Sequence, residues 1–531
     1  MKLAKSLLLG SATAFVAVAG ANAADLPSKK AAPATYVKVC DAYGAGFYTI
    51  PGSDTCIKVG GRVRADYSYS GKQDVYTSNV SANYYNSTSG ASVNNTGLWT
   101  SAASIAAFNG AGNTSKPSSS ALTYLPNGVA AGAQNTYGWE ARGRVDLDAR
   151  TATAYGTVQS VAAIRLARTT GVLDQSGPAQ SSSGAGATLE AAYIRFAGFT
   201  FGAARDNFAF MPSVMYGAGH WASFANGAKQ IAYTARLGGG FSATLAVQDA
   251  ADTTAGGQNA FLAVTRATGA PVFLASTPFG IAYTGAAAPY ANKEMPQVNA
   301  RVDFEQSWGS LSAMGAVGKA VNVSADATST NLTKTTWAAG AGAKINLPMI
   351  ASGDALYLNG GYANGMTEYT TNWTSFKSSD TKRNVGGFVV NHPSWVSGTD
   401  STGAATIETL KSWNVAALMT HFWTPQWRSA VVGTYGKIEG TALSKAQVFG
   451  YGGGAFGDAT VWNVGTQLAF LPAKDFEIGV DVLYARVEQD VRRLSWASLP
   501  ANDATTAPSA SQVTREKAGN WTGRLRVERT F

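Results

Sequence analysis

The chain ends in the stretch WTGRLRVERTF, residues 521–531, in which apolar and polar side chains alternate with a period of two. One face carries Trp521 and Leu525, and the other carries Arg524 and Arg526. Because side chains alternate between faces along a β-strand, this stretch predicts a strand with one apolar and one charged face. A water-soluble domain would bury the apolar face in a core. A transmembrane barrel would instead turn it toward lipid and direct the arginines into a water-filled lumen.

The start of the chain indicates export. Lys2 and Lys5 precede an apolar stretch at 7–19, and Ala-Asn-Ala at 21–23 matches a cleavage pattern for secreted proteins. We therefore expect residues 1–23 to be a signal peptide that is removed from the mature protein. A membrane anchor is the alternative, but the apolar stretch is short and rich in Gly and Ala.

The composition favours a barrel over a bundle of transmembrane helices. Hydrophobic residues make up 45% of the chain and charged residues only 14%, with 59 Gly, 22 Tyr, 22 Phe and 13 Trp. After residue 23 no run of 18 apolar residues occurs, so the sequence predicts no transmembrane helix. The chain is also long for one ordinary soluble domain, whereas one large barrel with long loops accounts for its length.

The two-faced pattern of the last strand recurs along the chain. Short turns alternate with long polar loops, and a tight turn at 149–151 separates the second strand from the third. The sixteen predicted strands lie at 57–69, 137–148, 152–167, 188–197, 199–205, 230–237, 241–249, 297–306, 311–321, 337–347, 355–362, 413–423, 427–437, 461–470, 476–486 and 521–531. This pattern predicts an all-β fold, a 16-stranded antiparallel transmembrane β-barrel at 57–531, with both termini in the periplasm.

Two cysteines mark the segment that precedes the barrel. Cys40 and Cys56 are the only cysteines, and they fall in residues 24–56, which we expect to be a periplasmic N-terminal segment. In an exported protein an isolated pair predicts a disulfide, here worth on the order of 3 kcal/mol in the chain-entropy model. A metal site is the alternative, but two thiols with no nearby His make a poor one.

One long connection differs from the other loops. Residues 206–228 follow the fifth strand and contain Phe208, Phe210, Met211 and Met215. An apolar loop should pack against other parts of the protein rather than lie in solvent. Its place after the fifth strand resembles that of the third long loop of general porins, and this resemblance implies that it folds into the barrel as a constriction loop. Packing at a subunit contact or over the mouth of the barrel is the alternative.

The charged faces of the strands supply the candidate pore-lining residues. The first and last strands must be neighbours in a closed barrel, so their arginines would form one basic wall, opposed by acidic residues on the other side. The candidates are Lys58, Arg62, Arg64, Arg142, Arg144, Arg165, Arg205, Asp206, Asp303, Glu305, Asp481, Arg524 and Arg526. Such a wall indicates a preference for anions. Alternatively, each charge pairs with its cross-strand neighbour on a hydrated wall.

Four short segments carry a family resemblance: VCDAYG at 39–44, GFTFG at 198–202, INLP at 345–348 and TPQW at 424–427. In content and order they resemble the alphaproteobacterial outer-membrane porin family known from Brucella and rhizobia. The resemblance implies a homotrimer of sixteen-stranded barrels that passes small hydrophilic solutes by diffusion. The first loop and residues 364–411 are longer than the resemblance implies, so pore size and ion preference do not follow from it.

Sites for other chemistry find little support. The three histidines, His220, His392 and His421, lack metal-ligand spacing. The G-x-G-x-x-G match at 452–457 lacks the strand–helix context of a nucleotide site, and Ser-x-x-Lys at 379–382 lacks partner motifs. We expect no cofactor, no metal, no catalysis and no nucleic-acid binding. The alternatives are an outer-membrane barrel enzyme, which needs a His beside Ser or Asp on the rim, and an exported β-rich adhesin.

Location and partners follow from these expectations. The terminal Phe531 resembles the C-terminal assembly signal of outer-membrane barrel proteins. It predicts recognition by the barrel assembly machinery and insertion in the bacterial outer membrane. The expected partners there are lipid, lipopolysaccharide and small hydrophilic solutes.

Overall fold

The computed structural model describes most of the chain from Lys38 onward. The described residues are 38–71, 82–85, 92–95, 136–173, 184–216, 228–249, 275–277, 280–282, 290–291, 295–323, 332–370, 394–399, 405–442, 445, 455–492 and 513–531. The predicted signal peptide, His220, His392 and residues 379–382 lie outside these ranges. So do 217–227 of the predicted constriction loop.

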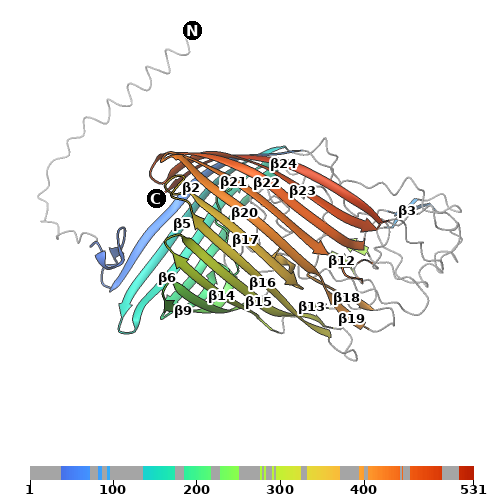
Figure 1. The fold of residues 1–531 in the computed structure, drawn as a ribbon, viewed down its shortest axis with the longest axis horizontal. Helices are drawn as coiled ribbons and strands as arrows, with labels where there is room; N and C mark the ends of the chain where they lie inside the picture. The colour runs from blue at the N-terminus through green and yellow to red at the C-terminus, as the bar shows by residue number, and fades with distance from the viewer. Residues whose placement is uncertain are drawn as a thin grey trace, which may run out of the picture.

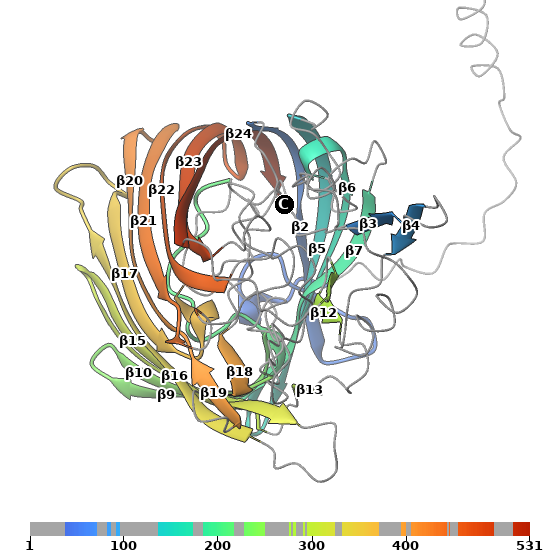
Figure 2. The same ribbon diagram turned by 90° about the vertical axis from the view of Figure 1, so that its right-hand side faces the viewer.

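Within these residues, one antiparallel sheet closes on itself as a barrel (Figures 1 and 2). Its sixteen long strands are β2 (Thr55–Ser70), β5 (Tyr137–Thr153), β6 (Gly156–Thr169), β7 (Gly184–Phe196), β8 (Phe199–Ala204), β9 (Ala228–Gly238), β10 (Phe241–Gln248), β14 (Gln297–Gln306), β15 (Gly309–Val323), β16 (Leu332–Asn346), β17 (Ala355–Asn364), β20 (Lys411–Thr424), β21 (Trp427–Glu439), β22 (Ala455–Ala473), β23 (Phe476–Arg492) and β24 (Val513–Thr530). Each pairs with its neighbours in this order, and β24 pairs with β2 from Arg62↔Thr530 to Ser70↔Thr522. The predicted sixteen-stranded barrel is confirmed.

The remaining elements are short. They are η1 (Asp41–Tyr43), β1 (Tyr48–Thr49), β3 (Ala82–Tyr85), β4 (Ser92–Asn95), η4 (Gly171–Leu173), β11 (Ala275–Thr277), β12 (Gly280–Ala282), β13 (Tyr290–Ala291), η5 (Thr367–Tyr369), β18 (Trp395–Thr399) and β19 (Ala405–Thr409). β1 and β13 extend the main sheet, while the pairs β3–β4, β11–β12 and β18–β19 form separate two-stranded sheets.

Burial alternates along the long strands as a barrel in lipid requires. On β2, Arg64, Asp66 and Ser68 are buried while Val63 is 58% exposed, and on β21 Val431 is 56% exposed between buried neighbours. The apolar face therefore points outward and the polar face inward, which inverts the arrangement of a soluble protein. In the described part of the chain no helix has the length and apolarity to cross a membrane.

Short turns gather at the end of the barrel where the C-terminus lies (Figure 1). Ala197 and Gly198 both have positive φ, 48° and 86°, as the tightest twisted hairpins require. The predicted turn at 149–151 is wrong, because β5 continues to Thr153. Arg150 remains in the strand because its guanidinium pairs with Asp148 and lies 4.8 Å from the ring centre of Phe47 in the N-terminal segment.

That N-terminal segment is tied to β2. Cys40 and Cys56 form the predicted disulfide, with their Cα atoms 6.1 Å apart. β1 pairs with β2 at Tyr48↔Ile57, beyond the point where β24 ends. The segment therefore covers an edge of β2 that the last strand leaves open.

Aromatic rings mark both ends of the apolar band. At the turn end, Phe241 contacts Phe304 and Trp427 contacts Phe470, with ring centres 4.4 and 4.7 Å apart. The opposite end carries a second set of ring contacts: Trp139–Tyr67, Trp337–Tyr362, Trp413–Tyr435, Trp462–Tyr484 and Tyr484–Trp521. Two such belts are typical of the two interfaces of a bilayer.

Candidate channel lining

A non-strand segment between β8 and β9 runs inside the ring of strands (Figure 2). We call its described residues, Asp206–Tyr216, the inner segment. It begins with Asp206, which is 2% exposed and accepts hydrogen bonds from Phe208 N at 2.9 Å and Asn299 Nδ2 at 3.3 Å. Arg301 of β14 donates to the carbonyl oxygens of Asn207 and Ala209. The first turn of the segment is thereby fixed to β14.

The middle of the inner segment packs on an apolar inner wall. Phe208 joins a buried cluster with Met314 and Tyr369, while Met211 and Met215 pack on alanines and aliphatic residues of β20, β21 and β23. Burial of such side chains contributes roughly 2 kcal/mol each. An apolar wall inside the barrel would be unfavourable if it faced water, so the segment and this wall depend on each other.

Two glycines make this contact possible. A Cβ atom at Gly340 would lie 2.9 Å from Phe208 Cζ, and one at Gly342 would overlap the ring of Phe210. β16 therefore lacks inward side chains where the two rings lie.

The far end of the segment is clamped by Tyr216. Its backbone N donates to Asp481 at 2.7 Å, and its backbone O accepts from Arg524 at 2.9 Å. Its ring lies 4.5 Å from the Arg526 guanidinium, and its hydroxyl donates to Glu477. The segment thus reaches from β8 to the last two strands.

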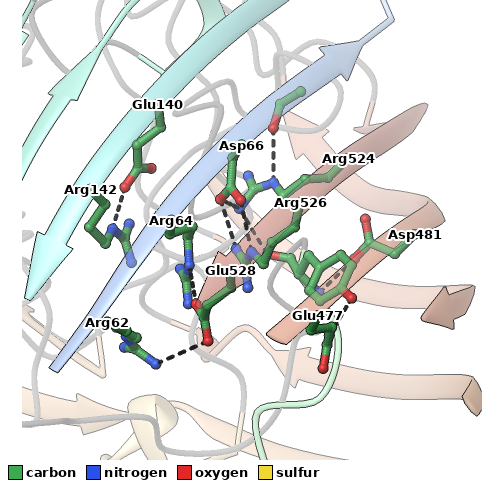
Figure 3. A network of polar contacts seen from close by, with 12 residues as sticks. Arg62, Arg64, Asp66, Glu140, Arg142, Glu477, Asp481, Arg524, Arg526 and Glu528 are labelled. Carbon is green, nitrogen blue, oxygen red and sulfur yellow. Dashed lines mark hydrogen bonds and ion pairs between the residues drawn. The ribbon is translucent and has the colours of Figure 1, made fainter. Parts of the chain in front are cut away.

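The wall opposite the apolar one carries dense charge (Figure 3). Arg526 binds Asp66 with two hydrogen bonds of 2.8 Å, and Arg64 binds Glu528 at 2.6 Å. Both pairs join β2 to β24 across the closing seam of the barrel. Asp66 is 0% exposed, so its charge depends on these partners, because an unpaired buried charge is costly.

The charges continue onto the next strands. Arg142 pairs with Glu140, and Arg144 contacts Asp146 at 2.6 Å and Glu190 at 3.0 Å. We call the inward charges of β24, β2, β5, β6 and β7 the charged wall. Its ion pairs include those of Arg62, Arg64, Arg142, Arg144, Arg150, Arg165, Arg524 and Arg526 with Asp66, Glu140, Asp146, Asp148, Glu190 and Glu528.

The structure brings the predicted arginines of the wall together, and of the predicted acidic residues it places Asp481 beside them, as the Cα partner of Arg524. Asp206 and Asp481 are buried and hold the two ends of the inner segment. Asp303 is bound to Arg301 at 2.8 Å, and Glu305 is exposed near the turn end of β14.

Lys58 and Arg205 also lie apart from the wall's ion pairs. The Lys58 ammonium is 6.0 Å from the ring centre of Phe47, near the N-terminal segment. Arg205 donates to the carbonyl oxygen of Met211 at 3.0 Å and so supports the inner segment.

Sequence reasoning missed several residues of this lining. Arg301, Tyr216, Glu477 and Arg428 were not candidates, although Arg428 and Glu477 pair at 3.1 Å beneath Tyr216. The carboxylate partners Glu190 and Glu528 were missed as well, although both sit on predicted strands. A test for opposite charges on the inward faces of adjacent strands would have found Glu528, because it is the Cα partner of Arg64.

His421, the histidine that the structure describes, holds a turn in place. His421 Nδ1 lies 2.6 Å from Asp354 Oδ2, and this pair fixes the turn between β16 and β17 to β20. Ser429 is the Cα partner of His421, but its hydroxyl accepts a hydrogen bond from Trp423 Nε1 at 3.0 Å. In the part of the chain that is described, no hydrogen bond joins Ser429 to His421, so these three residues do not form a hydrolytic relay.

Comparison with known proteins finds partial matches to porins. Porin Omp2a of Brucella ovis is 54% identical over 74 residues, which cover 14% of this chain and 21% of that protein. Porin Omp2b of Brucella canis is 55% identical over 74 residues, covering 14% and 20%. The aligned stretch thus spans about a fifth of the length of these relatives. Among solved structures, the outer membrane channel DcaP of Acinetobacter baumannii gives a TM-score of 0.47 at 14% identity, over 91% of this chain and 99% of that chain.

The family itself is decided by a broader match. A model described as "Porin subfamily" matches residues 25–121 and 123–523, which is nearly the whole sequence. The predicted family resemblance is confirmed, and the chain belongs to the porin subfamily.

Proposed function

We propose that this protein is an outer-membrane porin whose water-filled lumen passes small hydrophilic solutes and ions by passive diffusion. The observation that carries this function is a closed sixteen-stranded barrel with an apolar outer face and a charged inner wall. Closed barrels of this size enclose an aqueous channel, and polar walls lower the cost of moving hydrated solutes through lipid.

Swelling of protein-containing liposomes tests this function. In isotonic sugars of increasing size, we expect rapid swelling with the smallest sugars and a steep fall as size increases. Swelling no faster than that of protein-free liposomes at every size, from protein that keeps its folded barrel, would rule the function out.

The inner segment is the constriction of this channel. Its clamps at Asp206 and Tyr216 support this role, because they hold it across the inside of the barrel, from β14 to β23 and β24. In this arrangement solutes pass between the inner segment and the guanidinium groups of the charged wall that do not contact it.

The guanidinium groups of the charged wall support a preference for anions. A reversal potential across a KCl gradient measures the preference, and a cation-selective value would contradict it. Arg62→Gln should move the potential toward cation selectivity. Arg524 is a poorer choice for this test, because it also binds the backbone of Tyr216 and its loss would release the inner segment.

The proposal also includes export and assembly of the protein. Residues 1–23 act as a cleaved signal peptide, residues 24–56 form a periplasmic segment, and the barrel of residues 57–531 assembles as a homotrimer among lipid and lipopolysaccharide. The family supports the trimer, which chemical cross-linking of outer membranes tests: bands of three linked chains are expected, and monomers alone would contradict it.

Phe531 serves as the assembly signal read by the barrel assembly machinery. It also pairs with Gly61 through two backbone hydrogen bonds of 3.0 Å, at the seam of the barrel. Deletion of Phe531 should lower outer-membrane yield more than it lowers conductance per assembled channel. Equal yield would contradict the signal role.

A further inference from the structure

Three arginines of the charged wall lie side by side on neighbouring strands. Arg62 of β2 is the Cα partner of Arg144 of β5, which is in turn the partner of Arg165 of β6. We call these residues the arginine row. Like charges directly opposite each other destabilise a sheet, so barrel stability alone does not favour this arrangement.

The carboxylates around the row are unevenly distributed, and Arg144 has the closest of them, Asp146, at 2.6 Å. Glu190 contacts Arg144 at 3.0 Å and Arg165 at 3.5 Å, so one acid serves two arginines. Glu528 lies 3.9 Å from Arg62 but binds Arg64 at 2.6 Å. Arg62 is thus the member of the row with the weakest protein partner.

The hydrogen-bonding capacity of the row is also incompletely used. Among the described residues, Nε of Arg62 is buried without a hydrogen-bond partner, and Nε of Arg165 has only the 3.5 Å contact with Glu190. Buried donors normally have partners, so their absence marks a place where an acceptor is missing. The three side chains are 26–28% exposed, so their guanidinium groups are within reach of solutes in the lumen.

The rest of the charged wall differs in this respect. Arg526 is held by both oxygens of Asp66, and Arg524 donates to Ser68 at 2.8 Å and to the backbone of Tyr216. These arginines complete structural contacts, whereas the arginine row has donors to spare.

Resting on the channel function above, we propose that the arginine row is a saturable binding site for solutes with two carboxylate or phosphate groups. Neighbouring strands lie about 4.8 Å apart, so adjacent guanidinium groups recur at about that spacing. Arginine binds both kinds of anionic group with charge-assisted hydrogen bonds. A short dicarboxylate contacts two members of the row at once, whereas a monocarboxylate contacts one.

Open-channel current through single trimers tests this site. Glutarate or acetate is added to one side of a planar bilayer at constant ionic strength in KCl, and the fall in chloride current is followed against concentration. We expect glutarate to reduce the current along a saturating curve and acetate to give no saturation. A second arm with inorganic phosphate, which carries its charge on one group, should saturate only at concentrations well above those for glutarate.

Two variants assign the effect to the row. Arg62→Gln should raise the half-saturating glutarate concentration roughly tenfold, as expected for the loss of one charge-assisted hydrogen bond. The matched control is Arg195→Gln, which removes one positive charge on β7 outside the row, where the guanidinium lies 4.7 Å from the ring centre of Tyr193. The control should leave the half-saturating concentration unchanged.

The possible outcomes distinguish failure of the binding-site proposal from failure of the channel function. Current that falls linearly with glutarate, equal effects of glutarate and phosphate, or equal effects of the two variants would each overturn the site, while KCl conductance would still support the channel. If folded protein gives no conductance in KCl alone, the channel function itself fails. Discrete ohmic steps in KCl from both variants show that each still forms the barrel.

Discussion

Gly479 matters because the Tyr216 side chain occupies the space that a side chain at position 479 would need. A Cβ atom there would collide with the hydroxyl of Tyr216, which donates to Glu477 just beyond. The absence of a side chain on β23 thus allows the constriction to be clamped.

Replacement of this glycine should release the clamp. We expect Gly479→Ala to displace the Tyr216 ring from Arg526 and to give a channel with larger, noisier current steps. Single-channel recording measures the effect, with Gly433→Ala as the control, because a Cβ at Gly433 meets nothing within 4 Å. Unchanged step size and noise in the Gly479 variant would show that the clamp does not hold the segment.

Glu368 supplies a second test at the residue scale. It lies in η5, next to Tyr369, whose ring packs 4.6 Å from Phe208 of the inner segment. Desolvation raises the pKa of Glu368 to about 7, assisted by the charge of Asp206 and opposed by hydrogen bonds from Ser394 and Gln297. Because this pKa lies above the usual value of 4.5, the stability linked to it is full below about pH 4.5 and is lost as pH rises through about 7.

Channel noise should therefore depend on pH. We expect current fluctuations to increase between pH 5 and pH 8 in the native protein, because the charged Glu368 loosens the packing of Tyr369 on Phe208. Glu368→Gln should remain quiet across this range, while Glu439→Gln on the exposed rim should behave as native. Identical pH profiles for all three proteins would argue against this reasoning.

At the scale of elements, the N-terminal segment compensates for the length of the last strand. β24 ends opposite Arg62, while β2 continues back to Thr55, and β1 pairs with the part of β2 that would otherwise be an open edge. Open strand edges invite pairing with other chains, so this cover also protects the assembled barrel. The disulfide keeps the cover in place.

Loss of the disulfide should weaken the barrel without altering the channel. The double variant Cys40→Ser/Cys56→Ser should lose about 3 kcal/mol of stability. In detergent, its heat-induced shift on gels should occur at a lower temperature, while its single-channel conductance stays native. If reduced native protein and the double variant both melt at the native temperature, the disulfide contributes no stability.

The elements were largely predictable, because a period of two survives in every long strand. Their ends were less so. β24 begins at Val513, eight residues before the predicted start at 521, and β23 runs on to Arg492. Strand pairing there continues beyond the aromatic belt into polar sequence, where alternation of apolar side chains no longer marks a strand.

The types of residue that line the candidate site were predictable from the sequence, but the contacts between them were not. The arginines of β2 and β24 were placed on one wall because the first and last strands of a closed barrel must meet. The clamp at Tyr216 joins residues 265 positions apart, and no local pattern contains that information. Asp206 and Asp481 were expected to face the arginines. Asp481 is the Cα partner of Arg524, whereas Asp206 lies at the start of the inner segment, and both carboxylates hold that segment.

At the scale of the whole molecule, two halves of the barrel have different tasks. The wall from β14 to β23 holds the apolar clusters that pack on the inner segment, while the strands from β24 to β7 bear the charged wall. Under the proposed function, solutes pass off the barrel axis, along the guanidinium groups of the charged wall.

Single-channel recording in a planar bilayer tests this account most directly. Purified protein added to a bilayer in KCl should insert as discrete steps of ohmic conductance. A variant that lacks residues 208–214 should give larger steps, because the inner segment then no longer fills its side of the lumen. Absence of steps from folded native protein, or steps of equal size in the two proteins, would contradict the account.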